Sequence, residues 1–228
     1  MAEKIYTIPI NEAFQQSDQC PFCALRTRYE SEALDYILGP AMMESDIRME
    51  TNRLGFCKKH FTALLARQKR QPLGLILESH LMAIQDALAQ SDGKRKRKSS
   101  DLAEQLSAFA HSCYICNRLD TLEGRTTSNA VHMWKTDREY RARFEARSDY
   151  CLPHIAALLE AAGNELGGQY AQFIEALTPL INSQLDALLQ SVQGFNASFD
   201  YRNAGKPLSP GEIHAIENAI AFLTGYAP

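Results

Sequence analysis

The stretch CPFC, residues 20–23, is followed later in the chain by CKKH, residues 57–60. The same two motifs then recur in the same order, as CYIC at residues 113–116 and CLPH at residues 151–154. Together they contain all six cysteines of the 228-residue chain. Zn²⁺ in structural sites is held tetrahedrally by four thiolate or imidazole ligands. Two CxxC and two CxxH motifs therefore predict two Cys3His metal sites.

The spacing within each copy predicts which motifs share a site. Between Cys23 and Cys57 there is room for about 16 helical residues outward and about 16 back, roughly 24 Å each way at 1.5 Å per residue. Such a helical hairpin would return each CxxH to the CxxC that precedes it. The predicted first site is Cys20, Cys23, Cys57 and His60. The predicted second site is Cys113, Cys116, Cys151 and His154.

The ligand types also limit the chemistry of these sites. Four protein ligands close the coordination sphere, whereas catalytic zinc keeps one position open for water, so we expect two structural zinc ions per chain and no catalytic residue among the ligands. Two alternatives remain: an iron–sulfur cluster in each site, and a redox thiol switch. A c-type haem is excluded because Ala24 and Asn117, not histidines, follow the CxxC motifs.

The rest of the sequence predicts an all-α fold. Leu77, Leu81, Ile84 and Leu88 have helical spacing, and a second apolar helical pattern covers residues 173–192. Near the C-terminus, SPGE offers Ser209 as a helix N-cap and Glu212 at the third helical position, the signature of a capping box. We therefore expect a short helix after residue 209.

A duplication organises the chain. The CxxC motifs are offset by 93 residues and the CxxH motifs by 94. The prediction is two pseudo-repeated helical units in a bundle-like body, each fastened by a Cys3His site. The expected bounds are 1–92 for the first unit, 93–100 for a basic linker, 101–192 for the second unit and 193–228 for a C-terminal extension.

Charge and hydropathy exclude some classes of protein. The net charge is -3, which gives no overall reason to expect nucleic acid or an anionic membrane as a partner. No apolar run approaches the roughly 20 residues of a membrane span, and the N-terminus lacks a signal-peptide pattern. We therefore expect a cytoplasmic protein, in which reduced cysteines bind metal. The run KRKRK, residues 94–98, could contact phosphate, but no aromatic residues interleave with it.

Two charged segments suggest another binding surface. Residues 43–53 and 135–147 carry interspersed acidic and arginine side chains. These could line a polar groove for an anionic or peptide ligand, although an ordinary ion-paired helix surface has the same composition. The chain has no P-loop and no GxGxxG motif.

Several segments resemble a known protein family. KIYTIPINEAF at residues 4–14, CPFCAL at 20–25, the stretch 38–60 that ends in GFCKKH, and DYRNAGKP at 200–207 are similar to an uncharacterised bacterial family, common in anaerobes, with paired CPxC and GFCxxH motifs. Members are sometimes labelled transporter substrate-binding proteins, which the absence of an export signal, a lipobox and an α/β pattern contradicts. The resemblance implies a metal-binding bacterial protein and assigns no catalytic residue.

These observations favour a zinc-stabilised binding or adaptor protein whose partner is a protein, a peptide or a small anionic ligand. A metal- or redox-responsive sensor is the alternative, and an enzyme acting at a polar groove between the repeats is a further one. The partner, the pathway and the oligomeric state do not follow from the sequence.

Overall fold

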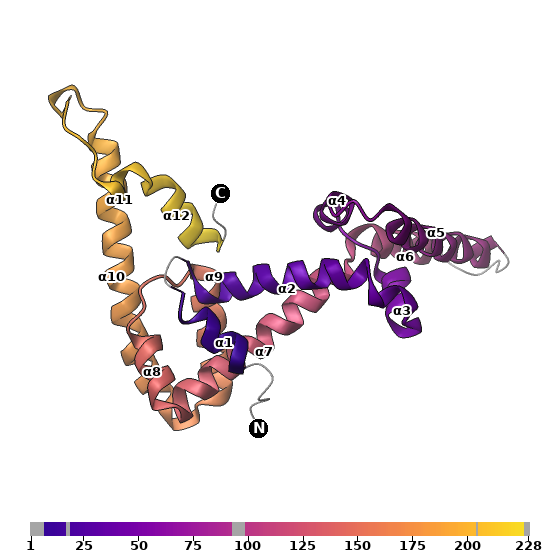
Figure 1. Ribbon diagram of the computed structural model, residues 1–228, viewed down its shortest axis with the longest axis horizontal. Coiled ribbons are helices and arrows are strands. Elements are labelled where there is room, and N and C mark those ends of the chain that lie inside the picture. The colour runs from indigo at the N-terminus through magenta and orange to yellow at the C-terminus, as the bar shows by residue number, and fades with distance from the viewer. Residues whose placement is uncertain (1–6, 17–18, 93–98, 204, 226–228) are drawn as a thin grey trace. The chain divides into compact units, whose positions relative to one another are not determined.

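The computed structural model describes residues 7–16, 19–92, 99–203 and 205–225. Within these ranges the regular structure is entirely helical, as predicted (Figure 1). The α-helices are α1 (Thr7–Ala13), α2 (Pro21–Ile37), α3 (Ser45–Leu54), α4 (Lys58–Ala66), α5 (Arg70–Asp92), α6 (Ser99–His111), α7 (Tyr114–Thr136), α8 (Arg138–Glu145), α9 (Leu152–Glu165), α10 (Tyr170–Ala197), α11 (Pro210–Ile213) and α12 (Ala215–Thr224). Short 3₁₀ turns are η2 (Pro40–Met43), η3 (Gly167–Gln169) and η4 (Tyr201–Asn203).

The chain forms two compact units, which we call the middle unit and the terminal unit. The middle unit is Thr27–Thr121, and the terminal unit combines Met1–Arg26 with Leu122–Pro228. The chain passes from one unit to the other within α2 and again within α7. This division differs from the consecutive units 1–92 and 101–192 expected from the sequence.

The order of helices still repeats. Each CxxC is followed by a long helix, a short helix, the CxxH motif, a further helix and a second long helix, as α2 to α5 and then as α7 to α10. The run KRKRK of the predicted linker 93–100 lies outside the described residues, and Ser99 begins α6. The predicted extension from residue 193 starts inside α10. The predicted capping box at Ser209 is confirmed: its hydroxyl accepts from the Glu212 amide, and the Glu212 carboxylate accepts from the Ser209 amide.

Each unit has a core of its own. Aromatic side chains dominate the core of the terminal unit, where Trp134 is fully buried, its ring edge-on to Phe173 with the centroids 5.0 Å apart, and its indole N–H donates to Glu145 over 3.0 Å. Aliphatic side chains dominate the middle unit, with Ile37, Leu64 and Ile76 among its buried residues. Burying such side chains is the main favourable term in folding.

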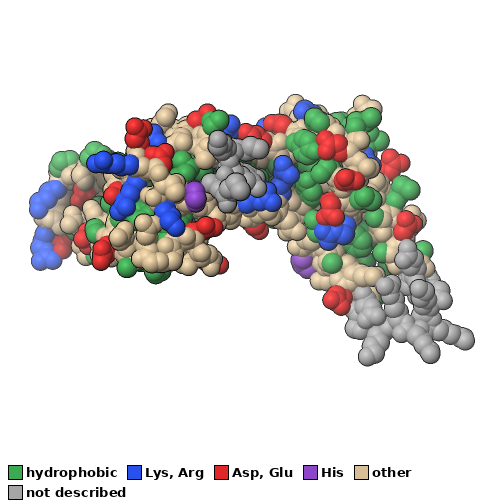
Figure 2. All heavy atoms as spheres, turned by 90° about the horizontal axis from the view of Figure 1, so that it is seen from below, with side chains coloured by type: hydrophobic (Ala, Val, Ile, Leu, Met, Phe, Trp, Pro, Cys, Tyr) green, Lys and Arg blue, Asp and Glu red, His purple; other side chains and the backbone are tan. Residues whose placement is uncertain are grey.

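The long helices α5 and α10 are amphipathic but only partly covered. On α5 the predicted apolar positions Leu77, Leu81 and Leu88 are exposed to solvent, whereas Leu73 and Ile76 are buried. On α10 the first half is buried at Phe173 and Leu177, and every residue of the second half is half-buried or exposed. Charged and hydrophobic side chains alternate over the face seen in Figure 2. None of the described helices is long and apolar enough to span a membrane.

Candidate metal centres

The four motifs converge in two groups of side chains, one in each unit. We call them the terminal site and the middle site. The terminal site is Cys20, Cys23, Cys151 and His154. The middle site is Cys57, His60, Cys113 and Cys116. In both, the candidate ligand atoms all lie within 4.8 Å of one another.

All eight predicted residues therefore take part, but the predicted pairing is wrong. Each CxxC shares a site with the CxxH of the other copy. The predicted hairpin fails because its two arms differ in length. α2 has 17 residues and α3 has only 10, which gives roughly 25 Å outward and 15 Å back at 1.5 Å per residue. The turn at Gly39–Met43 uses residues that the prediction assigned to the return helix.

Local structure places the ligands of the middle site. Gly55 ends α3 with φ of +58°, a left-handed conformation that favours glycine. Its carbonyl accepts from the Tyr114 amide over 3.0 Å, and the Leu54 carbonyl accepts from the Ser112 hydroxyl over 2.6 Å. These bonds hold the segment before Cys57 against the residues on either side of Cys113. They are a direct reason why CKKH meets CYIC.

In the terminal unit an arginine holds the corresponding segments together. Arg147, whose side chain is 9% exposed, donates to the carbonyls of Phe14, Gln16 and Gln19 and to both carboxylate oxygens of Asp149. The carbonyls precede Cys20, and Asp149 precedes Cys151. One buried guanidinium thus fixes the entry to CPFC beside the entry to CLPH.

The CxxH motifs begin helices, as predicted. Cys57 is the N-cap of α4 and Cys151 is the N-cap of α9, and Pro153 occupies the first turn of α9, where proline is favoured. The positive end of a helix dipole favours a thiolate at such a position. Three residues along each helix, the histidine ring reaches back to the sulfur of the N-cap cysteine.

In both sites one ring nitrogen of the histidine faces three sulfurs. His60 Nδ1 lies 3.2 Å from Cys57 Sγ, 3.2 Å from Cys113 Sγ and 3.4 Å from Cys116 Sγ. The corresponding distances from His154 Nδ1 are 2.9 Å to Cys151, 3.6 Å to Cys20 and 3.4 Å to Cys23. A tetrahedral zinc ion, with bonds of about 2.3 Å to sulfur and about 2.05 Å to nitrogen, places a sulfur and a ring nitrogen about 3.6 Å apart. The arrangement fits one tetrahedral ion with modest expansion.

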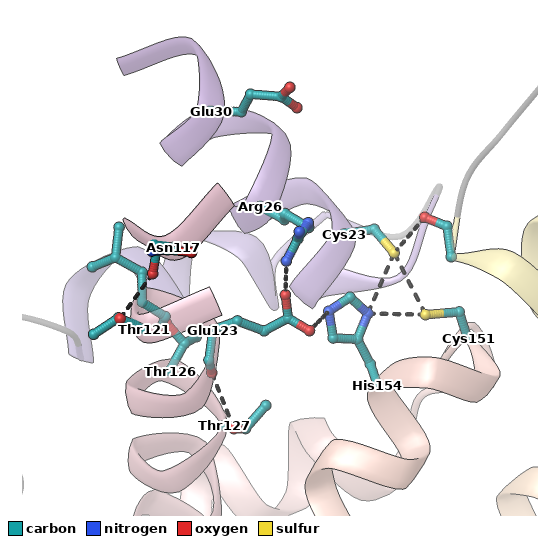
Figure 3. Close-up of polar contacts among 12 residues, drawn as sticks. Cys23, Arg26, Glu30, Asn117, Thr121, Glu123, Thr126, Thr127, Cys151 and His154 are labelled. Carbon is teal, nitrogen blue, oxygen red and sulfur yellow. Dashed lines mark hydrogen bonds and ion pairs between the residues drawn. The ribbon is translucent and has the colours of Figure 1, made fainter. Parts of the chain in front are cut away.

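The other ring nitrogen faces a carboxylate. His60 Nε2 lies 3.0 Å from Glu30 Oε1, and His154 Nε2 lies 3.3 Å from Glu123 Oε1 without the alignment of a hydrogen bond. Figure 3 shows Glu123 between Arg26 and His154, with Cys23 and Cys151 on the far side of the ring. Such a carboxylate fixes the tautomer and orientation of a metal-binding histidine.

The sequence analysis missed these two carboxylates, although a signal for them is present. Glu30 and Glu123 each stand ten residues after the first cysteine of a CxxC motif, and they are 93 residues apart, as the CxxC motifs are. Each lies on the helix that starts with the CxxC of one site and serves the histidine of the other. Lys59 pairs with Glu30 over 2.8 Å, and Arg26 pairs with Glu123.

The clustered thiols and imidazoles shift one another's proton affinity. Hydrogen bonds with Cys151 and Cys23 lower the pKa of the Cys20 thiol, and the matching bonds with Cys151 and Cys20 raise the pKa of Cys23. Burial lowers the pKa of His154, but contacts with Cys151, Cys20 and Glu123 outweigh it and raise that pKa to about 11. A bound cation would relieve this competition among thiols, because it favours the thiolate form of all three.

The middle site has the same internal conflict. Burial acts to raise the pKa of the Cys57 thiol, but the backbone amide of His60 and contacts with Cys113 and Cys116 outweigh it and lower that pKa. Burial and the neighbouring Cys113 raise the pKa of Cys116 to about 12. Contact with His154 lowers the pKa of the Glu123 carboxyl, while at Glu30 the pairing with Lys59 outweighs burial and lowers its pKa.

The polar segments suggested as a ligand surface are engaged within their own units. Arg48 donates to Ser79 over 2.8 Å, and Arg53 pairs with Glu50 over 2.7 Å. In the terminal unit, Arg141 pairs with Glu145 over 2.8 Å, and Arg143 donates to Asn11 over 2.6 Å. Each of these arginines contacts a side chain of its own unit.

Comparison with known proteins agrees with the resemblance of the motifs. The chain matches the family of unknown function DUF6062 over residues 1–228. It belongs to that family. The chain is also similar to an uncharacterized 23.9 kDa protein in the xynA 3′ region of Caldicellulosiruptor sp. (strain Rt8B.4). The two are 22% identical over 215 residues, which cover 92% of this chain and 97% of the relative. No solved structure matches the chain.

Proposed function

We propose that the chain is a zinc-stabilised helical binding protein with one structural Zn²⁺ in each unit. The observation that carries the proposal is the convergence of three sulfurs and one imidazole nitrogen within 4.8 Å at two places. The donor set is the one that structural zinc prefers, and four protein ligands leave no position for a substrate. When bound, the metal supplies a cross-link between segments that are distant in the sequence.

The compactness of both groups favours a single ion over an iron–sulfur cluster. In the middle site, Cys57 Sγ and Cys116 Sγ are 3.9 Å apart, and in the terminal site Cys23 Sγ and Cys151 Sγ are 3.5 Å apart. A cluster places several iron and sulfide atoms between its protein ligands. One tetrahedral ion needs only about 3.8 Å between sulfurs.

The binding role rests on the exposed apolar face of the long helices. Leu77, Leu81 and Met82 on α5, and Leu185 and Leu189 on α10, are exposed large hydrophobic side chains. The two helices are equivalent in the repeat, because each is the second long helix of its copy. Exposed apolar clusters of this kind are typical of surfaces that bind other proteins or peptides.

Elemental analysis of the purified chain tests the metal assignment. We expect two zinc ions per chain and cooperative loss of helical circular dichroism when a strong chelator removes them, because metal binding supplies part of the folding free energy of such sites. If the analysis finds iron and the protein absorbs visible light, an iron–sulfur cluster is the better assignment, and the sensor alternative is favoured. Protein that is folded and free of metal would overturn the proposal.

A further inference from the structure

A cavity of about 470 Å³ adjoins the terminal site. It lies within the terminal unit, between α10, α12 and the segments that carry the cysteines. Ser183 and Ala187 of α10 line it and are exposed to solvent, so the cavity reaches the surface beside this helix. Its volume is in the range of pockets that admit small molecules.

One wall of the cavity consists of metal ligands. Cys20, Cys23 and Cys151 all line it. His154 does not line it, and its ring nitrogen Nε2 faces Glu123 instead. A small molecule or ion in the cavity therefore reaches the three sulfurs of the site.

The C-terminal helix covers this wall. Ala221 and Phe222 of α12 line the cavity, and Gly225 follows at the end of the helix with φ of +72°. A Cβ atom on Gly225 would lie 3.2 Å from Cys151 Sγ and 3.5 Å from Cys23 Sγ. The backbone at Gly225 thus approaches the sulfurs closely on one side of the cavity.

The charged side chains that line the cavity determine which ions it favours. The polar side chains that line the cavity are serines, amides, Tyr150 and the carboxylate of Asp149, and no Lys, Arg or His of the described chain is among them. Arg147, which pairs with Asp149, does not itself line the cavity, so the lining presents a carboxylate and no cationic side chain of the described chain. A cleft lined by one sign of charge concentrates ions of the opposite sign.

We propose that this cavity is the route by which a divalent cation enters and leaves the terminal site, and by which small neutral thiol-directed molecules reach its cysteines. The inference rests on the proposed metal site. The middle site differs in charge, because the exposed Lys58 directly follows its candidate ligand Cys57. Anionic reagents are therefore disfavoured at the terminal site relative to the middle site.

Alkylation of the zinc-loaded full chain tests the route. Iodoacetamide forms a bond from its methylene carbon to a cysteine sulfur, iodide leaves, and the zinc ion is released to solution. Mass spectrometry of the digested protein gives the rate at each cysteine, so the two sites are compared in one molecule. Ala187→Trp fills the cavity, and Gln193→Trp is the matched control on α10, because Gln193 is exposed and does not line the cavity.

We expect Ala187→Trp to slow alkylation of the three terminal-site cysteines by at least about tenfold, equivalent to about 1.4 kcal/mol in the barrier, with little change at the middle site. Gln193→Trp leaves both rates unchanged. Ser183→Trp at the cavity mouth gives the same result if Ala187→Trp fails to fold. Unchanged rates at the terminal site in both cavity variants would overturn the route. So would equal slowing at both sites, which indicates that opening of the whole fold limits the reaction.

A pair of reagents of similar size tests the charge selection. Iodoacetate carries a carboxylate where iodoacetamide carries a neutral amide. We expect the ratio of the iodoacetamide rate to the iodoacetate rate to be larger at Cys20, Cys23 and Cys151 than at the middle-site cysteines. An equal ratio at the two sites contradicts the electronegative lining. A chain that binds no metal refutes the proposed function, whereas a zinc-loaded chain insensitive to the cavity variants refutes the route alone.

Discussion

His60 Nε2 lies 3.0 Å from Glu30 Oε1, on the side of the ring that faces away from the three sulfurs. Replacing Glu30 by glutamine keeps the shape and removes the charge that supports the histidine as a ligand. We expect metal affinity at the middle site to fall by about 10–100-fold, the usual effect of losing such a partner. Glu123→Gln has the same effect at the terminal site.

Competition with a chromogenic chelator measures these affinities, and cysteine alkylation identifies which site releases its metal. Glu32→Gln is the matched control, because Glu32 lies on the same helix and forms only an exposed pair with Arg28. Equal weakening of both sites by either variant contradicts the assignment of one carboxylate to each histidine.

The pairing of the motifs predicts the metal content of two triple variants. Replacing Cys20, Cys23 and Cys151 by serine removes every sulfur of the terminal site and leaves the middle site intact, so one zinc ion per chain is expected. Replacing Cys20, Cys23 and Cys57 damages both sites, and no site keeps four ligands. If each CxxC instead pairs with the next CxxH, the two results are exchanged. Metal stoichiometry by elemental analysis separates the two topologies.

Gly55 is expected to tolerate no side chain. A Cβ there would lie 2.7 Å from His80 Nε2, and the residue has φ of +58°. Gly55→Ala should therefore lower the free energy of unfolding by about 1–3 kcal/mol, the typical cost of a strained backbone conformation. Gly74→Ala is the control, because Gly74 lies inside α5 with open space around it. It should stabilise the chain by about 0.4–1 kcal/mol. Urea denaturation measures both, and destabilisation by both would contradict the explanation.

Arg147 is expected to matter for the terminal site although it binds no metal. Arg147→Ala leaves the carbonyls before Cys20 and the Asp149 carboxylate without their donor. The expected loss is about 1–3 kcal/mol for the unpaired buried groups, together with weaker metal binding at the terminal site alone. Arg147→Lys restores little, because an ammonium cannot reproduce the planar fork.

Arg202→Ala serves as the control for this prediction, because Arg202 forms an exposed pair with Asp200 and should change stability little. Thermal unfolding and site-resolved metal release measure both effects. An Arg147→Ala variant with unchanged metal binding at the terminal site would falsify the role of the guanidinium.

The residues of the two candidate sites could be predicted from the sequence, but how they are grouped could not. Eight cysteine and histidine residues in matched motifs left few other choices, since residue type alone indicates thiolate and imidazole ligands. The pairing depends on where helices end. The turn at Gly39–Met43 and the end of α3 at Gly55 make α3 shorter than α2. The spacing of the cysteines in the sequence does not reveal either boundary.

The apolar pattern of α5 shows a similar limit. Leu77, Leu81 and Leu88 correctly predicted a helix, but not which face is buried. The buried face contains Leu73 and Ile76, and His80 is the buried residue one turn further along the helix. Helical spacing reveals a face, whereas burial depends on which neighbours arrive, and here His80 bonds to the Asn52 carbonyl over 2.8 Å.

The pairing of the motifs sets the order in which the two candidate sites are completed during synthesis. The sites are nested like brackets: Cys57 and Cys116 are separated by 59 positions in the chain and lie wholly inside the interval of 128 positions between Cys23 and Cys151. On the ribosome the middle site has all its ligands once Cys116 has emerged. CPFC, although made first, lacks the other two candidate ligands of its site until CLPH is translated. A chain that ends before Cys151 therefore has all four candidate ligands of the middle site but only two of the four for the terminal site.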